Sequence, residues 1–240
     1  MKKKILIFIV TYQSSFRLSV IMKKIRKLNL KTDSYKILIS DDCSTDDTIN
    51  YINKIKPTKQ IKILVNKKNL HYGGNIKQCL KYAIKKKFNY AIMIHGDDQY
   101  DSKYIPEITR NLKKPNIDIV TGSRMLNKKK AISGGMPMYK FLGNIILTKI
   151  LNLSCNTNFT DAHTGLWGYN LNIFKKINLD KIDSAINFDS HLRIKAINHN
   201  YTIKEIPIRT FYRTERSSWH VIYSLNFLKH LLINLYKKIK

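Results

Sequence analysis

Three polar residues, His95, Asp97 and Gln99, follow an apolar run at positions two apart. In an extended chain, residues at this spacing project to the same side, so all three side chains would approach one ion. Mg²⁺ and Mn²⁺ prefer oxygen ligands, and imidazole is acceptable to Mn²⁺. The spacing therefore allows a site for Mg²⁺ or Mn²⁺, and a polar end of a strand is the alternative that the bare pattern favours.

Charged residues also follow two further apolar runs. Asp41 and Asp42 come directly after residues 35–40, and Arg124 comes shortly after residues 117–121. In open α/β sheets, ligands bind in the crevice beyond the carboxyl ends of the strands. We therefore expect the carboxylates, the candidate metal ligands and the arginine to meet in one crevice.

Short apolar runs alternate with stretches of helical spacing in the first half of the chain. The helical stretches cover about residues 18–28 and 76–84. This alternation predicts an α/β fold in which a mostly parallel sheet is flanked by helices on both faces. The runs expected to form its strands are residues 5–10, 35–40, 61–65, 90–94 and 117–121.

The alternation fades from about residue 128. Residues 128–138 are basic and contain two adjacent glycines, so we expect a mobile loop there. Residues 139–153 follow helical spacing, and so do the apolar residues between positions 222 and 239. A basic amphipathic helix of the latter kind can lie in a membrane interface. The alternative is that both helices pack on the domain or on a second subunit.

The 240 residues include 44 Lys and Arg against 16 Asp and Glu, which gives a formal net charge of +28. This charge predicts anionic partners, namely nucleic acid, an anionic membrane surface or phosphorylated substrates, and a solvated lysine-rich face is the plain alternative. The three cysteines lack the spacing of a zinc site or a disulfide framework, which fits a reducing cytosol. We expect no cleaved leader and no apolar run of the roughly 20 residues needed to span a bilayer, so any membrane contact would be peripheral.

Six segments in order carry a family resemblance. They are DDCSTDDT (41–48), GGNIKQCLKYA (73–83), HGDDQYD (95–101), GSR (122–124), TDAHTGLWGY (160–169) and EIPIRTFYRTERSS (205–218). Together they resemble the family 2 glycosyltransferases of GT-A fold, in particular the branch similar to dolichyl-phosphate mannose synthase and bacterial polyprenyl-phosphate glycosyltransferases. The resemblance implies a GT-A domain over residues 1–216, with a nucleotide-sugar half over about 1–125 and an acceptor half over about 126–216. A basic amphipathic helix over residues 217–240 would follow it.

The resemblance implies a nucleotide-sugar pocket in the first half. Asp41 and Asp42 would accept hydrogen bonds from the base or from ribose hydroxyls. Tyr12 would pack on the base, and Gly74 would lie in the same pocket. The family usually has a PxYNE-like segment at the end of its first strand, of which only the aromatic residue is retained here.

The resemblance also implies a metal site. His95, Asp97 and Gln99 fall on the family's DxDxQ motif, in which His95 replaces the first Asp. The replacement removes one negative charge and puts the identity of the metal in doubt. Asp97 would then be the indispensable ligand of Mg²⁺ or Mn²⁺ and a part of the nucleotide-sugar site.

Arg124, at the end of the nucleotide-sugar half, would stabilise the charge of the leaving diphosphate by holding two phosphate oxygens with its planar guanidinium, or it would form a surface ion pair. The acceptor side is implied by residues of the second half. Asp161 opens the family's DxxTG motif, where it would take the proton of a hydroxyl acceptor or orient an ionised phosphate acceptor. A turn residue is the plain alternative for Asp161. Lys128, Lys129 and His163 would lie on the acceptor side, and a structural histidine is the alternative for His163.

We therefore expect an inverting, metal-dependent glycosyltransferase of the hexosyltransferase type. Its donor would be a UDP- or GDP-linked sugar. Its acceptor would be a polyprenyl phosphate, which the enzyme would meet as a cytoplasmic protein bound peripherally at the inner face of the cell membrane, in cell-envelope glycan biosynthesis. The main alternative acceptor is a hydroxyl of a cell-surface glycan or lipopolysaccharide.

Proteins of other classes fit the sequence less well. A basic nucleic-acid-binding protein would interleave aromatic residues with arginine, whereas the aromatics here lie mainly within apolar runs, so we expect no nucleic-acid partner. A nucleotidyltransferase would have a Gly-rich, Lys-containing loop after its first strand, whereas residues 11–17 contain neither Gly nor Lys. The chain has no GxxxxGK[ST] or GxGxxG motif, which argues against ATPases and nicotinamide enzymes. A catalytically inactive, glycan-binding member of the family is a further alternative, suggested by His95.

Overall fold

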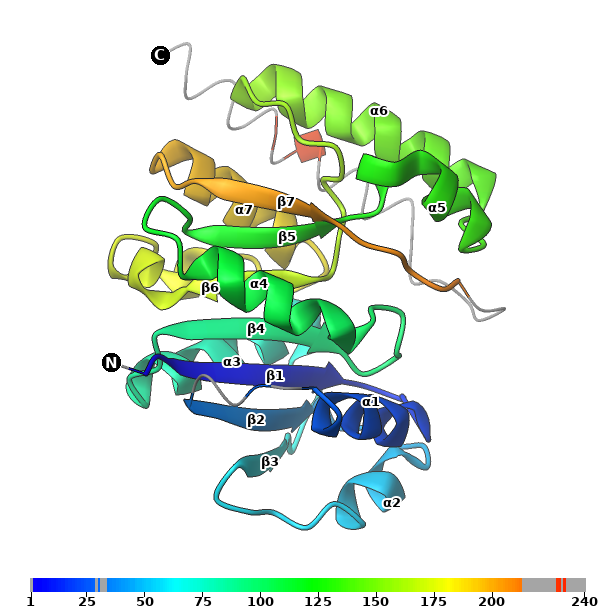
Figure 1. The fold of residues 1–240 in the computed structure, drawn as a ribbon, viewed down its shortest axis with the longest axis vertical. Coiled ribbons are helices and arrows are strands. Elements are labelled where there is room, and N and C mark those ends of the chain that lie inside the picture. The colour runs from blue at the N-terminus through cyan, green and yellow to red at the C-terminus, as the bar shows by residue number, and fades with distance from the viewer. Residues whose placement is uncertain (1, 29, 31–33, 213–227, 230, 232–240) are drawn as a thin grey trace.

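The computed structural model describes residues 2–28, 30, 34–212, 228–229 and 231. Within this part of the chain, one seven-stranded sheet lies between helices that cover its two faces (Figure 1). The strand order is β3-β2-β1-β4-β6-β5-β7. The strands are β1 (Lys4–Thr11), β2 (Ser34–Asp41), β3 (Ile61–Val65), β4 (Tyr90–His95), β5 (Ile119–Ser123), β6 (Trp167–Asn170) and β7 (Ile203–Pro207).

Most strand pairs in the sheet are parallel. β1 pairs in parallel with β2 and β4, β2 with β3, and β5 with β7. β6 is antiparallel to its neighbours β4 and β5. The predicted α/β fold with a mostly parallel sheet is confirmed, and each of the five predicted strands is present. β6 and β7 were not predicted, because the first has four residues and the second contains Lys204 and Glu205 within its run.

The helices form two layers, one on each face of the sheet. β1 alternates between them, since Ile5 and Ile7 belong to the apolar cluster with α1 and α4, and Leu6 and Phe8 belong to the cluster with α3 and α7. The α-helices of the described residues are α1 (Arg17–Arg26), α2 (Thr48–Asn53), α3 (His71–Lys85), α4 (Ile105–Leu112), α5 (Lys128–Ser133), α6 (Met138–Cys155) and α7 (Phe188–Asn198). The 3₁₀ helices are η1 (Ser102–Tyr104), η2 (Met125–Asn127), η3 (Leu171–Lys175) and η4 (Leu179–Lys181).

The prediction of a mobile loop over residues 128–138 is wrong for its first half, which forms α5. Ala131 is buried in a small apolar cluster with Met125 and Met136, and this packing holds the lysine-rich segment in a helix. The chain turns at the two glycines, and Gly135 has a positive φ of 82°. The helix predicted over residues 139–153 is confirmed as α6.

The amphipathic helix predicted over residues 217–240 lies mostly outside the described residues. Leu228, Lys229 and Leu231 are described and helical. Leu231 is buried in an apolar cluster with residues of α6 and α7, so the C-terminal segment packs on the domain at this point. Among the described residues, no helix has both the length and the apolar character needed to cross a membrane.

Candidate active site

A cleft of about 550 Å³ opens beyond the carboxyl ends of β1, β2 and β4. It has the position predicted from the strand ends and a volume typical of small-molecule sites. The hydroxyl oxygen of Thr11, which lies in its wall, is buried and has no hydrogen-bond partner among the described residues. The cleft is lined by Val10, Thr11, Tyr12, Ser14, Asp42, Asn69, His71, Tyr72, Asn75, His95, Gly96, Asp97 and Ile186.

The ring of His95, at the end of β4, is held on three sides. Tyr72 and Tyr100 contact it edge-on, with ring centroids 5.5 and 5.3 Å from that of His95. Gly165 lies so close that a Cβ atom there would be 2.5 Å from Cε1 of His95. The glycine of the DxxTG segment is therefore required to leave room for the histidine ring, and the ring is fixed in one orientation.

Tyr72 connects His95 to Asp189, which belongs to the first turn of α7. The Tyr72 hydroxyl donates to Oδ2 of Asp189 at 2.6 Å and lies 3.1 Å from Nε2 of His95. A tyrosine has one hydroxyl proton, so while Asp189 is ionised, Nε2 of His95 must be the donor to the tyrosine oxygen. This fixes the Nε2–H tautomer and leaves Nδ1 as the nitrogen with a free lone pair.

Asp189 is the functional candidate that the sequence analysis missed. Burial raises the pKa of its carboxyl group to about 7, against the opposing effects of the Tyr72 hydrogen bond and of Arg193. Its Oδ1 atom is buried and has no hydrogen-bond partner among the described residues. A carboxylate of this kind can accept a proton near neutral pH, which is what a general base requires.

The rule that ligands bind beyond the carboxyl ends of strands does not predict Asp189, because this residue follows a loop and lies in the first turn of a helix. Its signal in the sequence is an acid in the first turn of a helix, next to the apolar Phe188. Nδ1 of His191, which stands nearby, accepts a hydrogen bond from the backbone N–H of Asp183 at 3.2 Å.

The paired acids Asp41 and Asp42 have different roles. Both carboxylate oxygens of Asp41 accept hydrogen bonds from Ser44, at 2.9 Å from its backbone N–H and 2.6 Å from its hydroxyl. The prediction that Asp41 contacts the nucleotide is therefore corrected, since this carboxylate shapes the loop behind the cleft. Asp42 lines the cleft, where Asn66 and the backbone N–H of Leu70 hold its Oδ1 at 2.9 and 2.8 Å.

Gly74 also has a structural role in place of the predicted one. Its N–H donates to the carbonyl oxygen of Ser184 at 2.8 Å, and the N–H of Gly73 donates to that of Ala185 at 3.2 Å. A Cβ atom on Gly73 would lie 2.7 Å from the carbonyl oxygen of Asp183. The absence of a side chain at Gly73 lets the segment before α7 pack on the start of α3, and this packing brings Asp189 to Tyr72.

Asp97 and Gln99 do not continue the strand that ends at His95. The chain turns at Gly96, and Oδ1 of Asp97 accepts a hydrogen bond from the backbone N–H of Gln99 at 3.0 Å. The extended geometry predicted for the three residues is therefore wrong. His95 and Asp97 both line the cleft. Asp98 turns away and pairs with Lys24 of α1 at 2.7 Å.

Arg124 and Asp161 form a buried ion pair. Nε and Nη2 of Arg124 donate to the two carboxylate oxygens of Asp161 at 2.7 and 2.8 Å, and its backbone N–H donates at 3.0 Å. Asn144 adds a further hydrogen bond to the carboxylate at 2.7 Å. Although burial alone would raise the pKa of Asp161, Arg124 and these hydrogen bonds hold it well below its usual range.

The ion pair engages both residues for which catalytic roles were predicted. Two further donors of Arg124 are used by the Tyr212 hydroxyl and by the carbonyl oxygen of His163, each at 2.7 Å. A fully hydrogen-bonded carboxylate with a depressed pKa is a poor base, and a guanidinium with four of its five N–H groups engaged has little left for a phosphate. The pair instead ties the end of β5 to the DxxTG segment.

The other predicted residues lie at different distances from the cleft. Tyr12 is in its wall and is half exposed, as a residue that packs on a base would be. His163 is beside the ion pair, and burial lowers the pKa of its imidazole to about 3, so this histidine is neutral. Lys128 and Lys129 are exposed on α5, outside the residues that line the cleft.

Comparisons with known proteins agree with this architecture. A UDP-N-acetylglucosamine–dolichyl-phosphate N-acetylglucosaminyltransferase of Methanococcus voltae is 24% identical over 198 residues, which cover 77% of this chain and 78% of that enzyme. An uncharacterized protein of Methanocaldococcus jannaschii is 29% identical over 185 residues, which cover 77% of this chain and 74% of that protein.

Solved structures share the fold at low sequence identity. Glucosyl-3-phosphoglycerate synthase of Mycobacterium tuberculosis, in complex with Mn²⁺, UDP and glucosyl-3-phosphoglycerate, superposes with a TM-score of 0.67 at 12% identity. The superposition covers 98% of this chain and 80% of that one, and it shows that the sheet and helices form a GT-A fold. Residues 6–178 match the family described as glycosyl transferase family 2. The chain is therefore a member of glycosyl transferase family 2.

Proposed function

We propose that this protein transfers a sugar from a nucleotide-diphosphate sugar to an acceptor that approaches its cleft from the side of Asp189. The observation that carries the proposal is the meeting of Asp42, His95 and Asp97 in one cleft at the strand ends, with Asp189 joined to His95 through Tyr72. The solved relative that shares the fold binds UDP and Mn²⁺, which supports a nucleotide diphosphate as part of the donor.

The residues in the cleft fit Mg²⁺ or Mn²⁺. Such ions often take only one or two protein ligands, with phosphate oxygens and water as the others. Asp97 offers a carboxylate and His95 offers the lone pair of Nδ1, so these two would hold the ion. When bound, it would neutralise the negative charge that develops on the departing diphosphate.

Each remaining residue has a task that follows from its contacts. Asp42, oriented by Asn66 and Leu70, would accept a hydrogen bond from the base or from a ribose hydroxyl. Asp189 replaces Asp161 as our candidate base, because its pKa of about 7 and its unpartnered oxygen suit proton transfer. Tyr72 would hold that carboxylate in position.

The proposed reaction is a single inverting displacement. The acceptor oxygen forms a bond to the anomeric carbon while the bond from that carbon to the diphosphate oxygen breaks, and a hydroxyl acceptor passes its proton to Asp189. A phosphate acceptor is already ionised and gives up no proton. The hexosyl specificity of the reaction is part of this proposal.

We propose a polyprenyl phosphate as the acceptor, met at the inner face of the cell membrane. The net charge of +28 favours an anionic substrate, and the Methanococcus voltae relative is named for transfer to dolichyl phosphate. A glycan or lipopolysaccharide hydroxyl is the second candidate, and the pKa of Asp189 favours it, because only a hydroxyl acceptor needs a base.

A transfer assay separates the two acceptors. Purified protein would be incubated with UDP- and GDP-sugars, with Mn²⁺, and with either a short-chain polyprenyl phosphate or an oligosaccharide, and the products would be identified by mass spectrometry. A glycosylated polyprenyl phosphate is expected, and its yield should fall at least tenfold in Asp42→Asn and remain unchanged in the surface control Asp180→Asn. A product formed only on the oligosaccharide would favour the hydroxyl acceptor, and no product from any pair would contradict the proposed function.

A further inference from the structure

The helix α6 exposes apolar residues and buries polar ones. Ile146 is 57% exposed and Leu153 is 85% exposed, whereas Asn144, Thr148 and Ser154 are buried. A helix that faces water on one side normally has the opposite pattern. The exposed apolar residues, called here the α6 outer face, are Met138, Tyr139, Leu142, Ile146 and Leu153, which recur at helical spacing along one side.

The polar side of α6 is committed to the interior, so the orientation of the helix is fixed. Nδ2 of Asn144 donates to the buried carboxylate of Asp161 at 2.7 Å, and the Thr148 hydroxyl donates to Oδ1 of Asn144 at 2.9 Å. The same hydroxyl oxygen accepts the backbone N–H of Ala162 at 3.1 Å. A rotation of α6 that hid the outer face would break these hydrogen bonds and leave the Asp161 ion pair incompletely satisfied.

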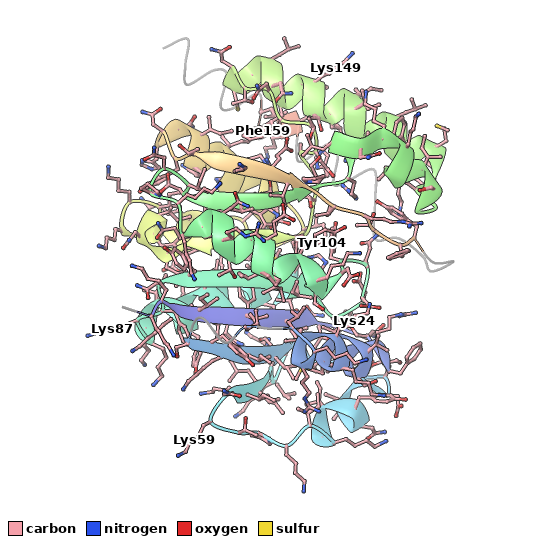
Figure 2. The ribbon with its side chains drawn as sticks, viewed as in Figure 1. Lys24, Lys59, Lys87, Tyr104, Lys149 and Phe159 are labelled. Carbon is pink, nitrogen blue, oxygen red and sulfur yellow. The ribbon has the colours of Figure 1, made fainter. Side chains whose placement is uncertain are left out.

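The stretch of sequence that contains α6 carries charge of only one sign. The sequence contains no Asp or Glu between Asp118 and Asp161, although it contains several lysines there. Lys149 lies in the same stripe as the apolar residues, and Figure 2 shows it on the outer side of α6. An apolar stripe accompanied only by cations is complementary to a bilayer surface with anionic head groups.

We propose that the α6 outer face is a docking surface for an anionic lipid bilayer, with the helix lying in the interface and Lys149 at the level of the head groups. The contact does not depend on the proposed transfer reaction, and it would give the protein a membrane location whatever its acceptor is. Figure 1 shows α6 at one end of the molecule, beyond β7.

Two other occupants fit the observations less well. A second copy of the chain would bring together two molecules that each have a net charge of +28, with Lys149 in each contact surface. Leu231, which belongs to the described part of the C-terminal segment, packs on the inner side of α6 with Leu147 and Leu151. Neither arrangement accounts for the absence of acids around the outer face.

Vesicle flotation of the full chain tests the proposal. The protein would be mixed with vesicles of phosphatidylcholine alone or with vesicles in which about a third of the lipid is phosphatidylglycerol. The test variant combines Leu142→Gln, Ile146→Gln and Leu153→Gln, and the matched control changes two exposed apolar residues elsewhere, Val65→Gln and Ile84→Gln. Because all five side chains are at least 40% exposed, both proteins should fold, which their thermal midpoints would verify.

The expected result is binding to anionic vesicles that decreases with salt, that is about tenfold weaker in the triple variant and that is unchanged in the control. Nucleotide binding by the triple variant should equal that of the wild type, so a failure of this proposal can be told apart from a failure of the proposed function. Equal flotation of the triple variant and the wild type would overturn the proposal. So would a wild type that binds no vesicles but forms a dimer that the triple substitution disrupts.

Discussion

At the scale of single residues, this site is distinguished by the hydrogen bonds that join Asp189 to Tyr72 and Tyr72 to His95. The histidine stands where the family motif has an aspartate, and an aspartate there would face a tyrosine whose one proton is already donated to Asp189. Two carboxylates would then compete for the same donor. We expect His95→Asp to lose transferase activity, even though it restores the first Asp of the DxDxQ motif.

The pKa of Asp189 leads to a prediction for activity. Transfer to a hydroxyl acceptor should increase as the pH rises through about 7, because the carboxylate must be ionised to take the proton. The same increase should be absent when the acceptor is an ionised phosphate. Initial rates between pH 5.5 and 8.5 with each acceptor would check this, and identical profiles for the two would count against a base role for Asp189.

The same pKa leads to a prediction for stability. A carboxyl group with a raised pKa in the folded state stabilises the fold fully below its unfolded pKa, near 4, and this contribution is lost as the pH rises to about 7. Asp189→Asn removes the loss, so at pH 8 it should stabilise the fold by on the order of 4 kcal/mol while abolishing transfer to hydroxyls. Urea unfolding at pH 5 and pH 8 would measure the difference, and a variant that is less stable at both would show that the buried charge is compensated.

Asp161 and Arg124 are predicted to act on stability first. Asp161→Asn leaves the Arg124 guanidinium buried without its counter-ion, which should cost about 3–5 kcal/mol. The double variant Asp161→Leu with Arg124→Met should be less destabilised than either single change, because it leaves no unpaired charge. Denaturant unfolding checks both statements. If Asp161→Asn were as stable as the wild type and yet inactive, the base role would return to Asp161.

At the scale of elements, the site depends on how closely α3 approaches the segment before α7. Gly73→Ala would place a methyl group 2.7 Å from the carbonyl oxygen of Asp183, so it should destabilise the protein by about 1–3 kcal/mol and move Asp189 away from Tyr72. Gly74→Ala is the matched control in the same helix, since its nearest contact would be the Cβ of Leu70 at 3.0 Å. Thermal midpoints and nucleotide affinity would be compared, and equal effects of the two changes would contradict this packing account.

The elements also show what the sequence could and could not predict. The five apolar runs predicted their strands, because a strand buried on both faces needs an unbroken apolar sequence. Helix α5 was not predicted, because its segment is rich in lysine and the helix is stabilised by a buried contact of Ala131 that the sequence alone does not show. For α6 the helix was predicted but the outward side was not, because its orientation depends on Asn144 and Asp161, which are distant in the sequence.

At the scale of the whole molecule, the sequence indicated which strand ends meet but not which side chains remain available there. Asp42, His95, Asp97 and Tyr12 do line the cleft. Asp41 and Arg124 have the same residue types as ligand-binding groups, yet Ser44 and Asp161 occupy them. Periodicity and motif spacing cannot show such pairing, because it depends on contacts between segments far apart in the chain.

The two proposed binding sites lie in different parts of the molecule. The cleft lies at the carboxyl ends of β1, β2 and β4, and the α6 outer face lies at the end of the molecule beyond β7 (Figure 1). The Asn144, Asp161 and Arg124 hydrogen bonds join α6 to the DxxTG segment, whose Gly165 packs against His95 of the cleft. The membrane and the nucleotide would thus bind different parts of one domain.

The central claim is that a nucleotide diphosphate binds this cleft through Asp97 with a divalent cation. Isothermal titration of UDP and of GDP into the protein, with and without Mn²⁺, tests it directly in the wild type, in Asp97→Asn and in the surface control Asp180→Asn. We predict that one nucleotide binds and that its affinity depends on Mn²⁺. Asp97→Asn should weaken this affinity at least tenfold, and the control should leave the affinity unchanged. Binding of neither nucleotide, or equal binding by Asp97→Asn and the wild type, would contradict it.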